Sequence, residues 1–245
     1  MSKCIFCKSA TEAFTTREHI LPESLGGGDW AILPDGLYCD QCQNRFGSAI
    51  EQQALGDYPF SLFRVLLGIP TKKGKAPWFK SWEGIVRASS EPGQIGFDPD
   101  PQFEQALTEG RKTQMRILAH PLRPDMICRT LLKMGIEVIA ADDPEGVFDE
   151  KFDSARNYAL LGQKDDNWWY LQREDMIAAS HYITKGITLD EWAANVKLEV
   201  SSIDEGAEVF HLKLMVLDLI TPLEPRIQPP LMEDLQEPEY RLFVV

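Results

Sequence analysis

The stretch Thr16-Arg17-Glu18-His19-Ile20-Leu21-Pro22 lies between two pairs of cysteines, and these segments together decide the fold of the first part of the chain. Both pairs have the spacing CxxC, and their members are Cys4, Cys7, Cys39 and Cys42. A CxxC pair forms a tight turn that directs both sulfurs at one ion, and four thiolates complete a tetrahedral structural zinc site. Residues 8–38, between the pairs, are long enough for a small hairpin over the ion. The sequence therefore predicts a zinc-bound module.

Side chains beside the cysteines indicate a second ion. Glu18 offers a hard oxygen ligand, and its neighbour His19 offers a general base. Gln43 and Asn44 follow the last cysteine, and their amide oxygens suit the same oxygen-preferring cation. The glycines at positions 26–28 have no Lys-Ser/Thr after them, so they predict a turn in the zinc module and not a phosphate loop.

Three motifs in this order resemble those of the HNH endonucleases, the ββα-metal or treble-clef nucleases. One group of that family reads CxxC, then EHxxPxxLGG, then CxxCNNxFG. This chain reads Cys4-Ile-Phe-Cys7, then Glu18-His19-Ile20-Leu21-Pro22-Glu23-Ser24-Leu25-Gly26-Gly27, then Cys39-Asp40-Gln41-Cys42-Gln43-Asn44-Arg45-Phe46-Gly47. The resemblance covers about the first 50 residues.

The resemblance implies a role for each of these side chains. The histidine that matches His19 activates the attacking water, and the acidic residue before it, here Glu18, binds the catalytic metal. An asparagine or histidine directly after the last cysteine supplies a second ligand. This chain departs from the pattern there, because Gln43 holds that position and Asn44 follows it. Either side chain is able to serve as the ligand.

The expected activity is therefore hydrolysis of phosphodiester bonds in nucleic acid, most simply DNA, with one Mg²⁺ or Mn²⁺ ion and His19 as general base. Zinc at the four thiols has no open position, so its expected role is structural. An alternative is a catalytically decayed zinc module that binds nucleic acid or protein. The acidic composition and Gln43 favour this alternative, whereas the retained Glu18-His19 pair counts against it.

Composition sets further limits on the chain. It has 245 residues, 44% of them hydrophobic, which suffices for one or two domains with a core. We see no leader-like segment before Cys4 and no apolar run near 18 residues, so we expect neither secretion nor membrane insertion. Four of five cysteines in CxxC pairs fit a reducing cytoplasm. The fifth, Cys128, is expected to be a buried small hydrophobe. A protein partner or a homo-oligomer stays open.

The formal net charge of −13 is unusual for a protein that grips a polyanion. Nucleic-acid binding is therefore expected at local basic sites, with Arg17 and Arg45 as candidate phosphate contacts. A longer basic strip runs over residues 72–87 and should lie beside the catalytic cleft. Its candidate contacts are Lys72, Lys73, Lys75, Lys80 and Trp78. The other interpretation is a solvated loop whose aromatic residues belong to the core.

The pattern of hydrophobic residues predicts an α+β fold. A zinc-bound ββα-metal (treble-clef) HNH module, residues 1–57, is followed by a larger α+β domain with a mostly antiparallel sheet, residues 58–245. Helices are expected at residues 43–54, 60–67, 124–141 and 151–161. Strands are expected at residues 84–88, 94–97, 114–119, 167–171, 196–203, 208–217 and 240–245, with a loop or arm at 222–238. His120, His181 and His211 lack a nearby second ligand, so no functional role is assigned to them.

Overall fold

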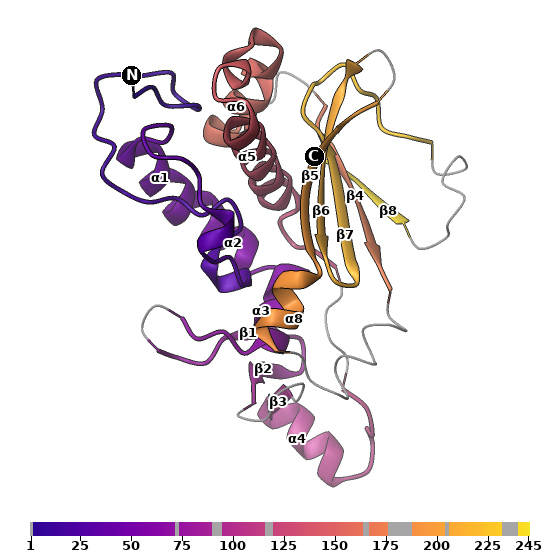
Figure 1. The fold of residues 1–245 in the computed structure, drawn as a ribbon. Coiled ribbons are helices and arrows are strands. Elements are labelled where there is room, and N and C mark those ends of the chain that lie inside the picture. Colours follow the sequence, from indigo (N-terminus) through magenta and orange to yellow (C-terminus); the bar gives the residue numbers. More distant parts are fainter. Residues whose placement is uncertain are drawn as a thin grey trace.

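The computed structural model describes residues 2–71, 74–89, 95–115, 120–163, 167–175, 188–203, 206–231 and 240–245. The fold is α+β, as the sequence predicts. A loop-rich N-terminal module with a helical run is followed by a small three-stranded sheet and then by a five-stranded sheet with its helices (Figure 1). Within the described ranges, no helix is both long enough and apolar enough to cross a bilayer.

The N-terminal module contains a helical run that starts directly after Cys39. The run consists of α1 (Asp40–Phe46), a π-helical turn (Gly47–Glu51) and α2 (Gln52–Leu55). Two short 3₁₀ turns, Glu23–Leu25 and Asp29–Ala31, lie between the cysteine pairs. The helix predicted at residues 43–54 is confirmed and starts earlier, directly after Cys39. Its buried residues Phe46, Ile50 and Ala54 recur at every fourth position and face the core.

The middle part contains α3 (Phe60–Leu67), a small antiparallel sheet and α4 (Pro101–Thr108). The sheet has the order β1 (Trp78–Ser81), β2 (Gly84–Ala88), β3 (Ile95–Pro99), and Val65 of α3 packs against Phe79 and Val86. The predictions of α3 and β2 are confirmed, and β3 ends two residues beyond its predicted limit. The sequence analysis missed β1, because four residues are too few for a clear alternation. It also missed α4, although Asp100 followed by Pro101 is a helix-start signal.

Two longer helices follow, α5 (Pro124–Asp142) and α6 (Asp153–Leu161). Both predictions are confirmed, except that the 3₁₀ turn Glu150–Phe152 takes the place of the first residues expected in α6. Another 3₁₀ turn, Gly146–Phe148, links the two helices. Cys128 of α5 is fully buried, as expected. The strand predicted at residues 114–119 is not found at Gln114 and Met115, and its remaining residues lie outside the described ranges.

The five-stranded sheet has the order β5-β6-β7-β4-β8 and is antiparallel throughout. Its strands are β4 (Trp169–Glu174), β5 (Val196–Ser202), β6 (Glu208–Leu214), β7 (Leu217–Pro222) and β8 (Tyr240–Val244). The prediction of one strand over residues 208–217 is wrong, because the chain reverses at Met215, which has φ of 54°. No Gly, Asn or Pro marks that turn. A last helix, α8 (Leu189–Ala194), was not predicted and begins with a capping box at Thr188.

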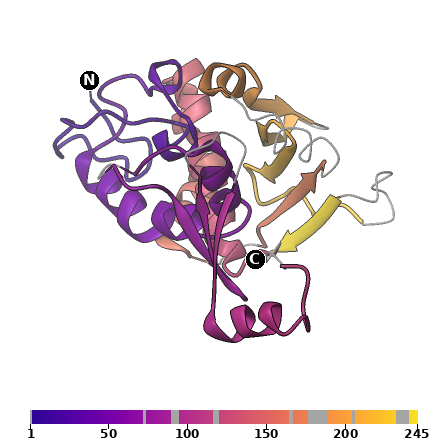
Figure 2. The ribbon, with the colours of Figure 1, turned by 90° about the horizontal axis from the view of Figure 1, so that it is seen from below.

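Helix α5 lies between the N-terminal module and the five-stranded sheet in both ribbon views (Figures 1 and 2). One buried hydrophobic cluster runs from the cysteines of the module through α5 to the strands. Trp192 of α8 donates a hydrogen bond from Nε1 to the carbonyl of Leu25 at 2.7 Å. The boundary at residues 57 and 58 therefore stays a prediction, since the two parts share a core.

Candidate functional site

The four cysteines of the CxxC pairs gather at one point. All four sulfurs lie within 4.8 Å of one another, and Cys7 Sγ lies 3.7 Å from Cys39 Sγ. Zinc–sulfur bonds of about 2.3 Å in a tetrahedron separate the sulfurs by about 3.8 Å. The donor set and its spacing thus fit one zinc ion held by four thiolates. Because all four positions are taken by protein, the site is structural and has no place for a substrate.

Backbone contacts hold the first pair in its turn. The amide of Lys8 donates to the carbonyl of Cys4 at 2.9 Å, and the amide of Cys4 donates to the carbonyl of Ser9 at 2.8 Å. Lys8 has a φ of 57°, which is the left-handed region that lets such a turn close. The second pair straddles the start of α1. Cys39 precedes the helix and Cys42 lies in its first turn.

The thiols differ in how readily they lose a proton. A hydrogen bond from Cys42 lowers the pKa of Cys4 to about 5, whereas burial raises the pKa of Cys39 to about 11. The hydrogen bond to Cys4 also raises the pKa of Cys42. A thiol must lose its proton to bind a metal, so zinc affinity should rise with pH.

The Glu18-His19 segment forms one side of a short antiparallel pairing. The amide of Ile20 donates to the carbonyl of Ala31 at 2.7 Å, and the amide of Leu33 donates to the carbonyl of Glu18 at 3.0 Å. His19 pairs with Ile32 between these bonds. Side chains alternate along an extended chain, so Glu18 and Ile20 point inward and are buried, and His19 is half-buried on the other face.

Asp40 anchors this segment to the start of α1. Its carboxylate accepts hydrogen bonds from the backbone amides of Thr15 and Thr16 at 2.8 and 3.1 Å, and from both hydroxyls. These bonds lower the pKa of Asp40 to about 2, with the Thr15 hydroxyl as the largest cause. The Asp40 carboxylate thus fixes where Glu18 and His19 stand relative to the helix that carries Gln43.

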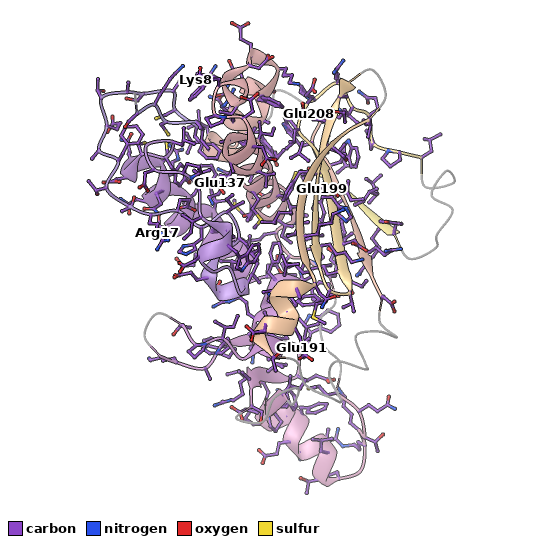
Figure 3. The ribbon with its side chains drawn as sticks, viewed as in Figure 1. Lys8, Arg17, Glu137, Glu191, Glu199 and Glu208 are labelled. Atoms are coloured by element: carbon purple, nitrogen blue, oxygen red, sulfur yellow. The ribbon has the colours of Figure 1, made fainter. Side chains whose placement is uncertain are left out.

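Glu18 belongs to a buried ion cluster. Its Oε1 lies 2.7 Å from Nζ of Lys133, and its Oε2 accepts a hydrogen bond from Nε2 of Gln43 at 2.7 Å. Lys133 lies on α5 and is fully buried, and its ammonium also lies 2.9 Å from Glu51 and 2.9 Å from Glu137. Figure 3 shows Glu137 on α5, between the module and the sheet. Both oxygens of Glu18 therefore have partners within the protein.

Gln43, and not Asn44, is the amide that meets Glu18. Besides Glu18 Oε2, Gln43 Nε2 contacts the carbonyl of Arg17 at 3.0 Å. Successive residues of a helix point about 100° apart, so Asn44 faces away and is exposed. His19 directly follows Glu18 in the chain. Within the described residues its imidazole has no hydrogen-bonding partner.

The expected phosphate contacts are spread over the surface. Arg17 is exposed on the outer side of the module and lies 3.4 Å from the carboxylate of Asp29 (Figure 3). Arg45 lies on the side of α1 opposite Gln43, in a hollow that Lys8, Asp153 and Arg156 also line. The backbone of Arg17 thus contacts Gln43, whereas Arg45 faces α6.

The basic strip is only partly described, since Lys72 and Lys73 lie outside the described residues. Lys75 is exposed, and Lys80 is paired with Asp100 at 2.8 Å. Trp78 is 62% exposed, whereas Phe79 is 7% exposed. The interpretation of Trp78 as a core residue is therefore wrong, and its ring is available for stacking. No hydrogen bond or ion pair among the described residues joins this strip to Glu18, His19 or Gln43.

The sequence analysis missed three members of the ion cluster, Glu51, Lys133 and Glu137. The sequence contained a signal for two of them, because Lys133 and Glu137 stand four residues apart in an otherwise apolar run that α5 buries.

The other histidines of the chain show no arrangement that indicates a functional site within the described residues. His211 bonds to Asp218 at 3.0 Å and His120 packs near Phe243, while His181 lies outside the described residues.

Comparison with known families agrees with this arrangement. Residues 4–58 match the family model of the HNH endonucleases, so this part of the chain is an HNH endonuclease domain. The match contains the four cysteines, Glu18, His19, Gln43 and Asn44, and it ends before α3 begins. No curated protein and no solved structure matched the chain. The family points to a nucleic-acid substrate and to nuclease activity.

Proposed function

We propose that the protein is a metal-dependent endonuclease that hydrolyses phosphodiester bonds, with DNA as its substrate. The observation that carries this proposal is the meeting of Glu18 Oε2 and the Gln43 amide at 2.7 Å, beside His19 on the same hairpin. Two oxygen ligands on neighbouring positions of an octahedral Mg²⁺ ion lie about 3.0 Å apart, given bonds of about 2.1 Å. The hydrogen bond thus brings the carboxylate and the amide close enough together for both to reach one such ion.

The two side chains would hold Mg²⁺ or Mn²⁺ as follows. Glu18 supplies Oε2, because Lys133 takes Oε1. The amide of Gln43 carries its oxygen and nitrogen in equivalent places, so a half-turn of the amide presents Oε1 where Nε2 now lies. That turn gives up the bonds to Glu18 and to the Arg17 carbonyl. A cation bound there supplies charge neutralisation at the scissile phosphate and its leaving oxygen.

The remaining steps fall to residues of the hairpin. A ring nitrogen of His19 takes the proton of the attacking water, a role that imidazole groups commonly fill in enzymes. Arg17 is placed to bind a phosphate oxygen after releasing Asp29, since the exposed pair at 3.4 Å is weak. The four thiols and their zinc keep the hairpin and α1 in register and take no part in the chemistry.

Nicking of supercoiled plasmid tests this proposal. We expect the zinc-loaded protein to nick DNA with Mg²⁺ or Mn²⁺ and to stop when the divalent cation is omitted. His19→Ala should lower the rate by about 100- to 10,000-fold, the usual contribution of a general base. Its zinc content and unfolding midpoint should equal those of the parent. An unchanged rate in the variant would refute the assignment of His19.

A second candidate function has its own support. Glu18 has both oxygens occupied, its side chain is 9% exposed, and the net charge of the chain is −13. These features favour a module that binds nucleic acid or protein without cleaving it. Under this alternative, plasmid stays intact at every concentration of Mg²⁺ and Mn²⁺, and a single-stranded or RNA substrate stays intact as well.

A further inference from the structure

Lys133 lies outside residues 4–58, which match the HNH family model, and yet it contacts Glu18 within them. It stands 115 positions after Glu18 in the chain, in the middle of α5, and its side chain has no exposed surface. Its ammonium lies within 2.9 Å of three carboxylates, which come from the hairpin, the π-helical turn and α5 itself. Burying an ammonium away from water is costly unless such partners compensate for it.

The ammonium divides the two oxygens of Glu18 between different neighbours. Oε1 is held by Lys133 on the interior side, and Oε2 is left for Gln43 on α1. The rings of Tyr38 and Phe46 also lie near the ammonium, with their centroids 5.7 and 6.0 Å away. A Glu18 side chain with this partner has little freedom to rotate about its last bond.

We propose that Lys133 is a positioning residue of the metal site, which holds Oε1 of Glu18 so that Oε2 alone faces the cation. This inference rests on the proposed function, in which Glu18 binds a divalent ion. Partners that orient a metal ligand from behind commonly matter almost as much as the ligand itself. Because Lys133 belongs to α5, the larger domain completes a site whose other members lie in residues 4–58.

Mn²⁺ binding to the zinc-loaded full chain tests this inference without any nucleic acid, by electron paramagnetic resonance of free Mn²⁺. The test variant is Lys133→Met with Glu137→Leu, which removes the buried pair on α5 and leaves Glu18 and Glu51 without their cation. Its matched control is Glu137→Leu, which keeps Lys133. We expect about 10- to 100-fold weaker Mn²⁺ binding in the double variant. The control should bind close to the parent.

A third variant separates orientation from packing. Lys133→Gln with Glu137→Leu keeps an N–H donor near Glu18 and should regain part of the lost affinity, which a packing role alone would not produce. The glutamine variant also allows the inference to be tested if the methionine variant fails to fold. Zinc content and unfolding temperature report folding for each variant.

Two outcomes overturn the inference and leave the proposed function untouched. Binding in the double variant equal to the control would show that Lys133 does not position Glu18. Tighter binding would show that the ammonium competes with the cation. Absence of any Mn²⁺ site that Glu18→Gln removes would overturn both the inference and the proposed function. If the parent binds Mn²⁺ through Glu18 but cleaves no nucleic acid, the proposed function fails and the role of Lys133 stands.

Discussion

The module takes part in two clusters of polar side chains, and they are assembled in different ways. The thiol cluster draws all its members from residues 4–42, and its turns are made by local backbone bonds. The ion cluster around Lys133 needs the hairpin, the π-helical turn and α5, which lies far along the chain. The comparison shows that residues 4–58 contain one cluster that is complete within itself and share another with the rest of the protein.

The largest expected effect follows removal of the local cluster. Cys39→Ser should abolish zinc binding and unfold the module, because structural zinc contributes on the order of 10 kcal/mol. Circular dichroism melting and zinc analysis measure this. Cys128→Ala is the control, since Cys128 lies outside the thiol cluster and should leave zinc content unchanged. Retention of one equivalent of zinc by a stable Cys39→Ser protein would contradict the claim that the thiol cluster binds zinc and stabilises the module.

The ion cluster should respond differently to loss of one member. Lys133→Met leaves buried carboxylates without their cation, and we expect a loss of about 3–5 kcal/mol in the free energy of unfolding. Adding Glu137→Leu should restore part of the lost free energy of unfolding. Urea unfolding measures both.

The exposed pair of Lys80 with Asp100 provides a matched control for that measurement. Lys80→Met should change the free energy of unfolding by less than about 1 kcal/mol, because water already solvates both charges. Equal losses in the free energy of unfolding at positions 80 and 133 would mean that the buried cluster stabilises the protein no more than an exposed ion pair does.

The basic strip offers a smaller effect on nucleic-acid binding. Lys75→Gln should reduce the salt slope by about one unit if that ammonium meets a phosphate. Lys80→Gln should reduce it less, because Asp100 already pairs with Lys80. Trp78→Ala should weaken binding by about 1–3 kcal/mol for one stacked base. Fluorescence anisotropy over a salt series measures all three.

Unfolding of Trp78→Ala supplies the control for the strip. The ring is exposed, so the variant should melt with the parent. Parental binding of all three variants at every salt concentration would make the strip a solvated loop.

The smallest expected effect is on the pH dependence of stability. The pKa of Asp40 in the folded protein is about 2, below its ordinary value of 3.8. Its contribution is therefore present above pH 4 and is lost as the pH falls toward 2. Asp40→Asn should flatten this part of the stability curve, measured by melting between pH 2 and 5. A curve that keeps the parental slope would show that Thr15 and Thr16 are held by other contacts.

Much of this arrangement was predictable because it is encoded locally. The CxxC spacing, the helix after Cys39 and the amphipathic residues of α5 each depend on neighbours within a few turns of chain. The Glu18-His19 pair was found in the same way. The partner of Glu18 was not, because no local pattern relates position 18 to position 133. The turn at Met215 was missed for another reason, since the apolar alternation of β6 at Phe210, Leu212 and Leu214 continues to Val216 without a typical turn residue.

Anomalous diffraction from a crystal of the zinc-loaded protein soaked in Mn²⁺ tests the central claim most directly. We predict two separate peaks, one of zinc among the four thiols and one of manganese within bonding distance of Glu18 Oε2 and the side-chain oxygen of Gln43. Lys133 should remain on Oε1 of Glu18. A manganese peak that does not touch Glu18, or none in the module at a concentration that supports cleavage, would contradict the account.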